Sequence, residues 1–189
     1  MRQGTRHLLT AIALWACLPG IAQTPTPSQT DTPATENQIK AAYLYKFGGY
    51  VEWPAQSFDK ADSAFVIGVV AADSFAEVLE QTITGRSMNG HPISVRKLRH
   101  GEGFTGMHMV FISHTENAAL NETIAGVKGQ AVLTVTDSER GPNAGSMINF
   151  VLEDNKVRFD IAPNPAEQNK LKISARLLSV ARKVLGRTS

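Results

Sequence analysis

The sequence predicts an α/β protein built as a three-layer α/β/α sandwich of the Rossmann-like type, with a mostly parallel sheet. Continuous apolar runs, AFVIGVV at Ala64–Val70 and MVFIS at Met109–Ser113, are typical of strands buried on both faces. These strands alternate with amphipathic segments, which places helices on both sides of the sheet. Two alternating runs at 146–162 and a periodic segment at 165–185 add a C-terminal β-hairpin and a long C-terminal helix.

The first 22 residues have the character of a secretory signal peptide. Basic residues precede the apolar run LLTAIALWACL at Leu8–Leu18, and small residues beyond it suit cleavage after Ala22. The run is shorter than the ~20 apolar residues that span a bilayer. A retained membrane anchor and lipidation at Cys17 are the alternatives. We therefore expect export to the periplasm, a flexible Pro- and Thr-rich linker at 23–35 and one folded domain at 36–189.

Cleavage after residue 22 would change both the charge and the cysteine content of the chain. The full sequence has 19 Lys and Arg residues against 17 Asp and Glu residues. Arg2 and Arg6 belong to the removed segment, which contains no acid, so the mature protein would be close to neutral. Bulk charge therefore gives no support for binding to nucleic acid or to anionic membranes. Because Cys17 is the only cysteine, the mature domain would have neither a disulfide nor a catalytic thiol.

The other elements follow from apolar periodicity and from capping and turn signals. Positions three and four residues apart predict helices, Thr115 can cap one of them, and Pro54 ends the first. Asn89–Gly90 marks a turn before a shorter, alternating strand. In chain order we predict a helix at 36–53, a strand at 64–70, a helix at 74–83, strands at 93–98 and 109–113, a helix at 115–127, a strand at 131–137, the hairpin at 146–162 and the helix at 165–185.

The hairpin and the last helix rest on two different periodicities. The hairpin turns at Glu153–Lys156, where Asp-Asn-Lys is a weaker turn signal than Asn-Gly. It contains Phe150 and Phe159, and a face more apolar than a solvated sheet edge should be would mark an interaction surface. The last helix is expected because apolar residues between Ile173 and Val184 recur at three and four, with basic residues facing outward.

The segment GEGFTG at Gly101–Gly106 fits the dinucleotide fingerprint G-x-G-x-x-G. A nucleotide-binding loop must leave a strand and open a helix, so that the pyrophosphate lies on free helix N–H groups. Here the segment leads directly into the predicted strand at 109–113. We therefore interpret it as a connection between two strands, and the sequence predicts no bound cofactor.

The polar residues of the sequence form no recognisable catalytic constellation. The histidines between positions 91 and 114 lack the spacing of a metal site, and we interpret them as surface and loop residues. Glu52, Asp73 and Asp137 end predicted elements, where strand tips of α/β folds carry sites. Helix capping and turn formation explain these carboxylates as well, and we favour that interpretation. The chain is therefore not predicted to be an enzyme.

Aromatic residues crowd the first predicted helix and its end. Tyr43, Phe47 and Tyr50 lie on the apolar face and are expected in the core, whereas Tyr45 falls on a different side. The pair Trp53–Pro54 either plugs the bottom of the sheet or presents a surface anchor, and we favour the plug.

Several separate segments together resemble one family. IKAAYLYKFGGYVEWP resembles the N-terminal signature of the YfiR/HmsC-like periplasmic proteins, which open with Ile-Lys-Ala-Ala-aromatic-Leu-aromatic-x-Phe and end in Trp-Pro. The later segments agree in order and spacing, and they are FVIGVV, MNGHPISVRKL, MVFIS, VLTVTD, GSMINFVLEDNKVRFDIA and LKISARLLSVARKV. The resemblance covers about residues 38–184, nearly all of the predicted domain.

The resemblance implies a non-enzymatic periplasmic repressor. Such proteins bind the periplasmic sensory domain of an inner-membrane diguanylate cyclase and keep cyclic-di-GMP synthesis and biofilm formation low. An outer-membrane lipoprotein can sequester the repressor and release the cyclase. The family also implies a homodimer and disulfides, but this domain has no cysteine to form them.

A binding protein of this kind needs an exposed, partly apolar patch. We predict that the patch lies on the hairpin and the last helix and contains Phe150, Phe159, Leu171 and Ile173, because they flank the edge where the sheet ends. The alternative function is a small-ligand carrier or sensor that uses the cleft at the strand tips and works with another envelope receptor or kinase.

Overall fold

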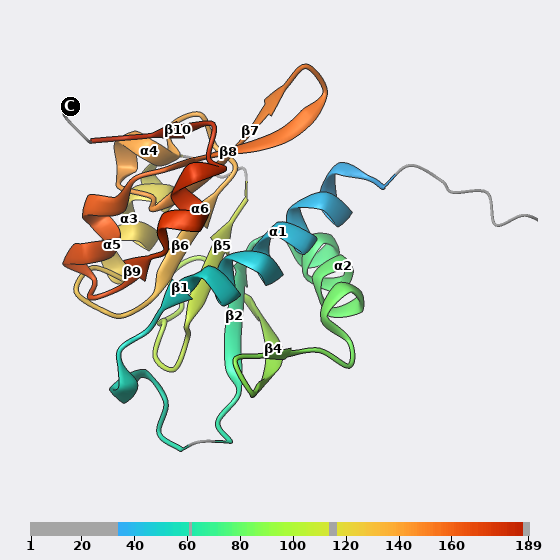
Figure 1. Ribbon diagram of the computed structural model, residues 1–189, viewed down its shortest axis with the longest axis vertical. Helices are drawn as coiled ribbons and strands as arrows, with labels where there is room; N and C mark the ends of the chain where they lie inside the picture. Colours follow the sequence, from blue (N-terminus) through green and yellow to red (C-terminus); the bar gives the residue numbers. More distant parts are fainter. Residues whose placement is uncertain (1–33, 61, 114–116, 187–189) are drawn as a thin grey trace, which may run out of the picture. The chain divides into compact units, whose positions relative to one another are not determined.

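The computed structural model describes residues 34–60, 62–113 and 117–186 (Figure 1). The predicted signal peptide, most of the predicted linker and the predicted cap Thr115 lie outside these residues. The elements are α1 (Glu36–Tyr50), β1 (Val51–Glu52), a 3-10 turn (Ala55–Ser57), β2 (Phe65–Val70), α2 (Asp73–Ile83), β3 (Ser87–Met88), β4 (His91–Leu98), β5 (Met109–Ile112), α3 (Asn117–Gly126), β6 (Leu133–Thr136), α4 (Gly141–Ala144), β7 (Ile148–Glu153), β8 (Lys156–Ile161), α5 (Pro163–Gln168), β9 (Lys172–Ile173), α6 (Ala175–Ser179) and β10 (Lys183–Val184).

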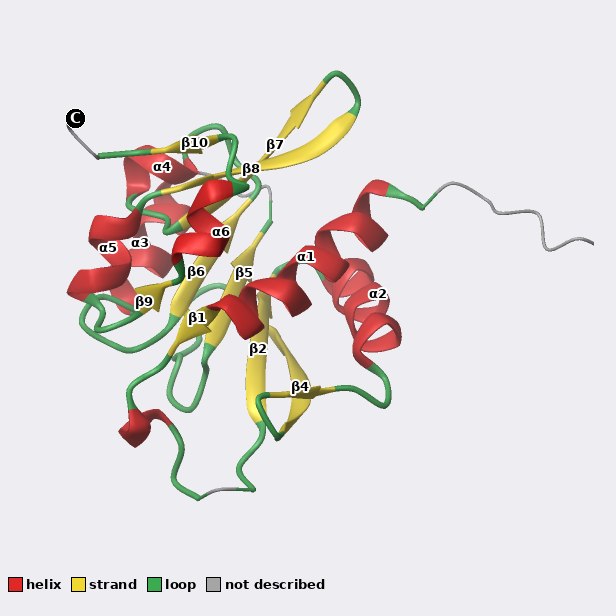
Figure 2. Ribbon diagram, in the orientation of Figure 1, coloured by secondary structure: helices red, strands yellow, loops and turns green. Residues whose placement is uncertain are grey.

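The main sheet has the order β10-β8-β7-β6-β5-β2-β4-β3. Strands β4, β2, β5, β6 and β7 are parallel, whereas β8 is antiparallel to β7, and β3 is antiparallel to β4. Strands β1 and β9 form a separate antiparallel pair. Helices lie on both faces of the main sheet (Figure 2). The predicted three-layer α/β sandwich with a mostly parallel sheet and a late hairpin is therefore confirmed.

Alternation along the strands divides the core between the two faces. Ile67 and Val69 of β2 pack in the cluster that contains residues of α1 and α2. Val66 and Val70, on the other face of the same strand, pack in the cluster that contains residues of α3. The strand is apolar along its whole length because helices cover both faces of the sheet, as the sequence predicted.

Helix α1 begins where the capping signals place its start. Thr35 accepts a hydrogen bond from the Gln38 N–H, and the Gln38 side chain accepts one from the Thr35 N–H, which together form a capping box. Near its other end, Gly48 allows the side chain of Met88 to approach the helix, because any Cβ at position 48 would collide with it. A glycine that weakens an isolated helix therefore makes room here for the observed position of the Met88 side chain.

Trp53 fills the end of the sheet rather than forming a surface anchor. Its ring packs edge-on against Phe65, with ring centroids 5.0 Å apart. Its indole N–H donates a hydrogen bond of 3.1 Å to the His108 carbonyl. These contacts confirm the predicted plug.

The predicted long C-terminal helix is wrong. The segment instead forms α5, β9, α6 and β10 in succession. Lys170 adopts a left-handed conformation with φ of 63°, which ends helical geometry, and β9 then pairs with β1. Ser174 caps the short helix α6, and β10 pairs with β8. Pairing with the free edges of β1 and β8 therefore overrides the helical periodicity of this segment.

His108 lies in the connection just before β5, as expected of a loop residue, but it is buried, so the interpretation of this histidine as a surface residue is wrong. Its Nδ1 accepts a hydrogen bond of 3.1 Å from the Val66 N–H, and its Nε2 lies 2.9 Å from the Ser57 carbonyl. Phe58 and Phe65 stack on the ring with centroids 4.3 and 5.0 Å away. Burial lowers the pKa of His108 below its ordinary 6.5, despite the hydrogen bond to Ser57.

We expect this histidine to make the protein less stable in mild acid. The unfolded chain binds the proton more readily than the folded chain, so the free energy of unfolding falls as the pH drops through 6.5. One proton contributes at most about 1.4 kcal/mol per pH unit. Urea unfolding at pH 7.5 and 5.5 checks this, with His108→Asn as the control that should lose part of the pH dependence. Equal dependence in the two proteins would contradict the assignment.

Candidate partner-binding site

The β7–β8 hairpin extends beyond the sheet to which it belongs. Its own pairing runs from Ile148 opposite Ile161 to Glu153 opposite Lys156. Only the first part of β7 pairs with β6, ending with Thr136 opposite Asn149. Figure 1 shows the hairpin projecting past the ends of the neighbouring strands. The outer half of the hairpin is therefore a two-stranded ribbon.

Aromatic side chains of α1 cover one face of the hairpin. Phe150 and Phe159 lie opposite each other on this face, and both are buried. Their ring centroids are 5.6 and 5.0 Å from that of Phe47, and Tyr43 packs against both at 6.0 and 5.3 Å. Pairs at these separations add to the stabilisation from burial. The inner face of the hairpin is consequently core.

The four residues predicted to form an exposed patch do not form one. Phe150, Phe159, Leu171 and Ile173 are all buried in one core cluster. The reason is that α1 covers the first two, while β9 pairs with β1 and brings the other two into the same core. Their side chains are thus unavailable on the surface of this fold.

The exposed apolar residue of the hairpin is Leu152. Its side chain is on the same face as Phe150 but is 58% exposed, because it lies beyond the cover of α1. In the part of the chain that the structure describes, Val180 is the other large apolar residue with high exposure, at 65%. A single exposed leucine is ordinary on a protein surface, so it is the position of Leu152 at the end of a projecting ribbon that makes it a candidate for contact with a partner.

Leu152 lies at a groove between the hairpin and the first turns of α1. The groove has a volume of about 390 Å³. Its lining combines apolar hairpin residues with charged residues of α1 and of the segment after β6. The lining residues are Glu36, Lys40, Asp137, Glu139, Phe150, Val151, Leu152 and Val157.

A buried ion pair between Lys40 and Asp137 forms part of the lining of the groove. Lys40 Nζ lies 2.8 Å from Asp137 Oδ2 and 2.6 Å from Glu36 Oε1. Burial opposes the charged form of Lys40, but the hydrogen bonds and charges of Asp137 and Glu36 outweigh it and raise its pKa above 10.5. The pair fixes α1 over the end of β6. Asp137 lies at a strand tip, as predicted, and we expected it to act in helix capping or turn formation. It instead anchors a helix through Lys40.

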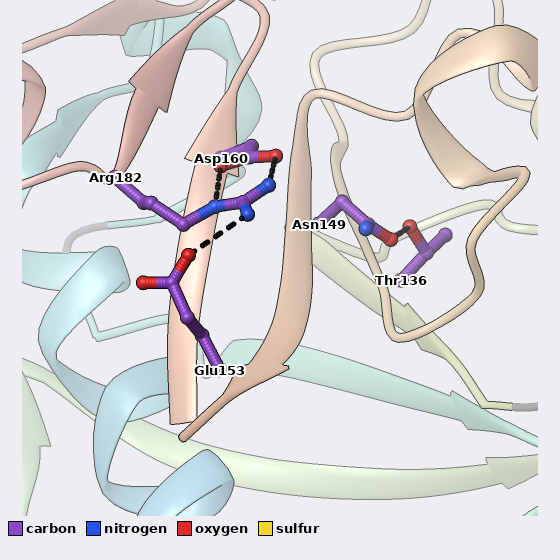
Figure 3. Close-up of polar contacts among 5 residues, drawn as sticks. All are labelled: Thr136, Asn149, Glu153, Asp160 and Arg182. Carbon is purple, nitrogen blue, oxygen red and sulfur yellow. Dashed lines mark hydrogen bonds and ion pairs between the residues drawn. The ribbon is translucent and has the colours of Figure 1, made fainter. Parts of the chain in front are cut away.

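A second ion pair fixes the outer edge of the hairpin (Figure 3). Arg182, just before β10, donates from Nε and Nη2 to the two carboxylate oxygens of Asp160 at 2.8 and 2.6 Å. Its Nη1 also donates to Glu153 at 3.3 Å. The hydrogen bonds to Asp160 raise the pKa of Arg182. A bidentate contact is directional, so it fixes the geometry of β8 as well as neutralising the buried carboxylate.

A polar cluster under α4 holds β6 and β7 together at the base of the projection (Figure 3). Thr136 donates a hydrogen bond of 2.6 Å to Asn149 Oδ1. Ser146 donates to the Ile148 carbonyl at 2.6 Å. Gly141 passes directly over this cluster, where a Cβ would collide with Thr136 and Asn149. The base of the hairpin is thus rigid where it leaves the sheet.

The structure also bears on the metal-site, nucleotide-loop and membrane-span alternatives. Among the described residues, no group of three or more His, Cys, Asp or Glu side chains is placed to hold a metal ion. The segment Gly101–Gly106 connects β4 to β5 and opens no helix, as the sequence predicted. None of the helices that the structure describes combines the length and apolarity that crossing a bilayer requires.

A second hollow lies between α3, α4 and α5. Its volume is about 310 Å³, and its walls include Ile124, Thr134, Met147 and Asn169. The amide of Asn169 is occupied by hydrogen bonds to the Gly129 N–H and the Val127 carbonyl. The hollow is not at the strand tips, where the alternative ligand-binding function was expected.

The fold and the site together define an α/β domain that presents a rigidly held hairpin and a charged groove. The sequence pattern of the YfiR/HmsC-like family matches residues 37–182, and the chain belongs to this family. The family is associated with periplasmic regulation of diguanylate cyclase signalling and is regulatory rather than catalytic.

The fold is also similar to a solved structure. The crystal structure of a conserved domain protein from Vibrio cholerae O1 biovar El Tor strain N16961 superposes with a TM-score of 0.54 and 11% sequence identity. The match covers 79% of this chain and 60% of that chain. At this identity the likeness concerns the fold alone. No curated protein matches the sequence.

Sequence reasoning missed Lys40 and Leu152. The signal for Lys40 was its position one turn after Glu36, on the side of the helix that also contains Leu44. The signal for Leu152 was its position at the turn end of an apolar strand face. Neither sequence pattern shows which residues of the hairpin α1 covers.

We expect the buried ion pair to be important for stability. Lys40→Met should lower the free energy of unfolding by about 3 kcal/mol, because it leaves the Asp137 carboxylate buried without its ammonium partner. Urea unfolding at pH 7 measures the change. The matched control is Lys172→Met, which removes the exposed Lys172–Glu52 pair and should have little effect. Equal effects of the two substitutions would contradict the prediction.

The glycine over the polar cluster gives a further prediction. Gly141→Ala should cost about 1–3 kcal/mol, since the added methyl group has to displace Thr136 and Asn149. Thermal unfolding followed by circular dichroism measures this cost. Gly103→Ala is the control, because Gly103 has no positive φ and a Cβ there would meet open space. A stable Gly141→Ala variant would show that α4 can move away from the cluster.

Proposed function

We propose that this protein is a periplasmic regulator that binds the periplasmic sensor domain of an inner-membrane diguanylate cyclase. Binding keeps the cyclase in a state of low activity and so lowers cyclic-di-GMP output and biofilm formation. The mature protein starts after Ala22, has no catalytic activity and is a homodimer. An outer-membrane lipoprotein competes for it and thereby releases the cyclase. Family membership supports the class of partner and the compartment.

The observation that carries the proposal is the exposed end of the β7–β8 hairpin. Leu152 is 58% exposed beside a groove of about 390 Å³, on a ribbon whose base is fixed by Arg182 and Asp160. A rigid apolar contact loses little conformational entropy on binding, which favours recognition of a protein surface. We therefore place the cyclase contact at the end of the hairpin rather than at the four residues predicted from sequence.

A second candidate function is the binding of a small molecule between α3, α4 and α5. The observation in its favour is the hollow of about 310 Å³ near Met147 and Asn169. Thermal shift measurements with periplasmic metabolites test this function. A shift that survives substitution in the hairpin would support it.

We expect a charge on the hairpin to weaken cyclase binding without unfolding the protein. Leu152→Asp should weaken binding to the purified periplasmic domain of a diguanylate cyclase from the same genome by about tenfold or more. Isothermal titration calorimetry measures the affinity. Val180→Asp is the matched control, because Val180 is similarly exposed but lines a different hollow, beside α6. Equal losses in both variants would argue against a contact at the hairpin.

A further inference from the structure

The outer half of β7 has a free backbone edge. In this half, β7 has β8 on one side, but its pairing with β6 stops at Asn149. No described residue makes a backbone hydrogen bond to Leu152 from the β6 side. The free edge lies where a longer β6 would otherwise continue, and the chain instead turns away there at Asp137.

The hydrogen-bonding register shows which peptide groups face this edge. The Phe159 carbonyl accepts from the Arg182 N–H, so the peptide groups of Phe159 point away from β7. Phe150 is opposite Phe159, and Leu152 is opposite Val157 two residues further along each strand. In an antiparallel pair these positions are therefore the ones that do not exchange hydrogen bonds. The N–H and C=O of Leu152 consequently point outward from the ribbon, toward the free edge.

The edge of β7 lacks the features that usually block pairing by another chain. Natural edge strands are protected by lysine, proline, bulges or a covering element. The other strand of the ribbon, β8, carries Lys156 and Arg158, and β10 covers its inner part. The outer half of β7 instead has Val151 and Leu152 before the terminal Glu153. Only the β8 side of the ribbon is therefore protected.

The lining of the groove beside this edge is rich in carboxylates, which favours an occupant with basic side chains. Among the described residues of its lining, Glu36, Asp137 and Glu139 contribute three carboxylates and Lys40 contributes one ammonium group. Lys40 is already paired with two of these carboxylates. A net negative groove next to an apolar edge complements a segment that carries basic and apolar side chains. On a strand, side chains at i and i+2 lie on one face, so both kinds can enter the groove together.

We propose that the partner binds by strand addition to the free edge of β7. The occupant is an extended segment of the cyclase periplasmic domain, with an apolar residue beside Leu152 and a Lys or Arg two positions away, facing Glu36 and Glu139. This inference rests on the proposed function for the identity of the partner. Main-chain hydrogen bonds to Leu152 supply affinity, and the groove supplies side-chain specificity.

A proline tests the backbone contact directly. Leu152→Pro removes the outward N–H without removing a β7–β8 hydrogen bond, since Leu152 occupies a non-exchanging position, and edge strands tolerate proline there. Leu152→Ala shortens the side chain but keeps the N–H. We expect Leu152→Pro to bind the purified cyclase domain about tenfold more weakly than Leu152→Ala, with similar melting temperatures for the two variants.

Amide hydrogen exchange gives an independent readout with the wild-type protein. The Leu152 amide should exchange rapidly in the free protein and become protected in the complex with the cyclase domain. A complex in which this amide stays unprotected, or in which both substitutions bind equally, overturns strand addition and leaves the proposed function standing. A wild-type protein that does not bind the cyclase domain overturns both.

Discussion

The cover that α1 provides over the inner face of the β7–β8 hairpin is the constraint on which the rest of the structure depends. A two-stranded ribbon alone is marginally stable in water, because it can bury little apolar surface. Tyr43 and Phe47 provide that burial for Phe150 and Phe159, and the four rings form one contiguous cluster. This cover holds the inner part of the hairpin, and the outer part continues beyond it. On this face the boundary between core and exposed surface lies between Phe150 and Leu152.

Charged groups then determine where the helix and the ribbon lie. Lys40 fixes α1 to the end of β6 through Asp137, and Arg182 fixes β8 to the last strand through Asp160. Buried ion pairs contribute little net stability when they are compared with apolar residues of the same shape, because desolvation offsets the attraction. Their directional contacts nevertheless disfavour other arrangements of the same apolar surfaces. In this fold apolar burial stabilises the core, and the two ion pairs fix the positions of α1 and β8 relative to the rest of the sheet.

Much of this fold could be predicted from the sequence, and the failures have a common physical cause. The buried strands, the first helix with its Thr35 cap and the late hairpin are encoded by local periodicity and capping chemistry. The C-terminal segment is periodic too, yet it forms short strands, because β1 and β8 offer edges that only the tertiary fold creates. The patch failed for the same reason: Phe150 and Leu152 have the same pattern in sequence, and only the position of α1 separates a buried residue from an exposed one.

Because some hairpin residues are buried and others exposed, only part of the hairpin sequence can determine which partner binds. Core residues such as Phe159 cannot change without loss of the cover that supports the ribbon, so they specify the fold rather than the partner. The end of the hairpin and the first turn of α1 are free of that requirement, since Leu152 and Glu36 contribute little to the core. A longer hairpin would expose more edge, because the rings of α1 pack only against its inner part. The length of the hairpin beyond this contact therefore affects how much surface the domain can offer to another protein.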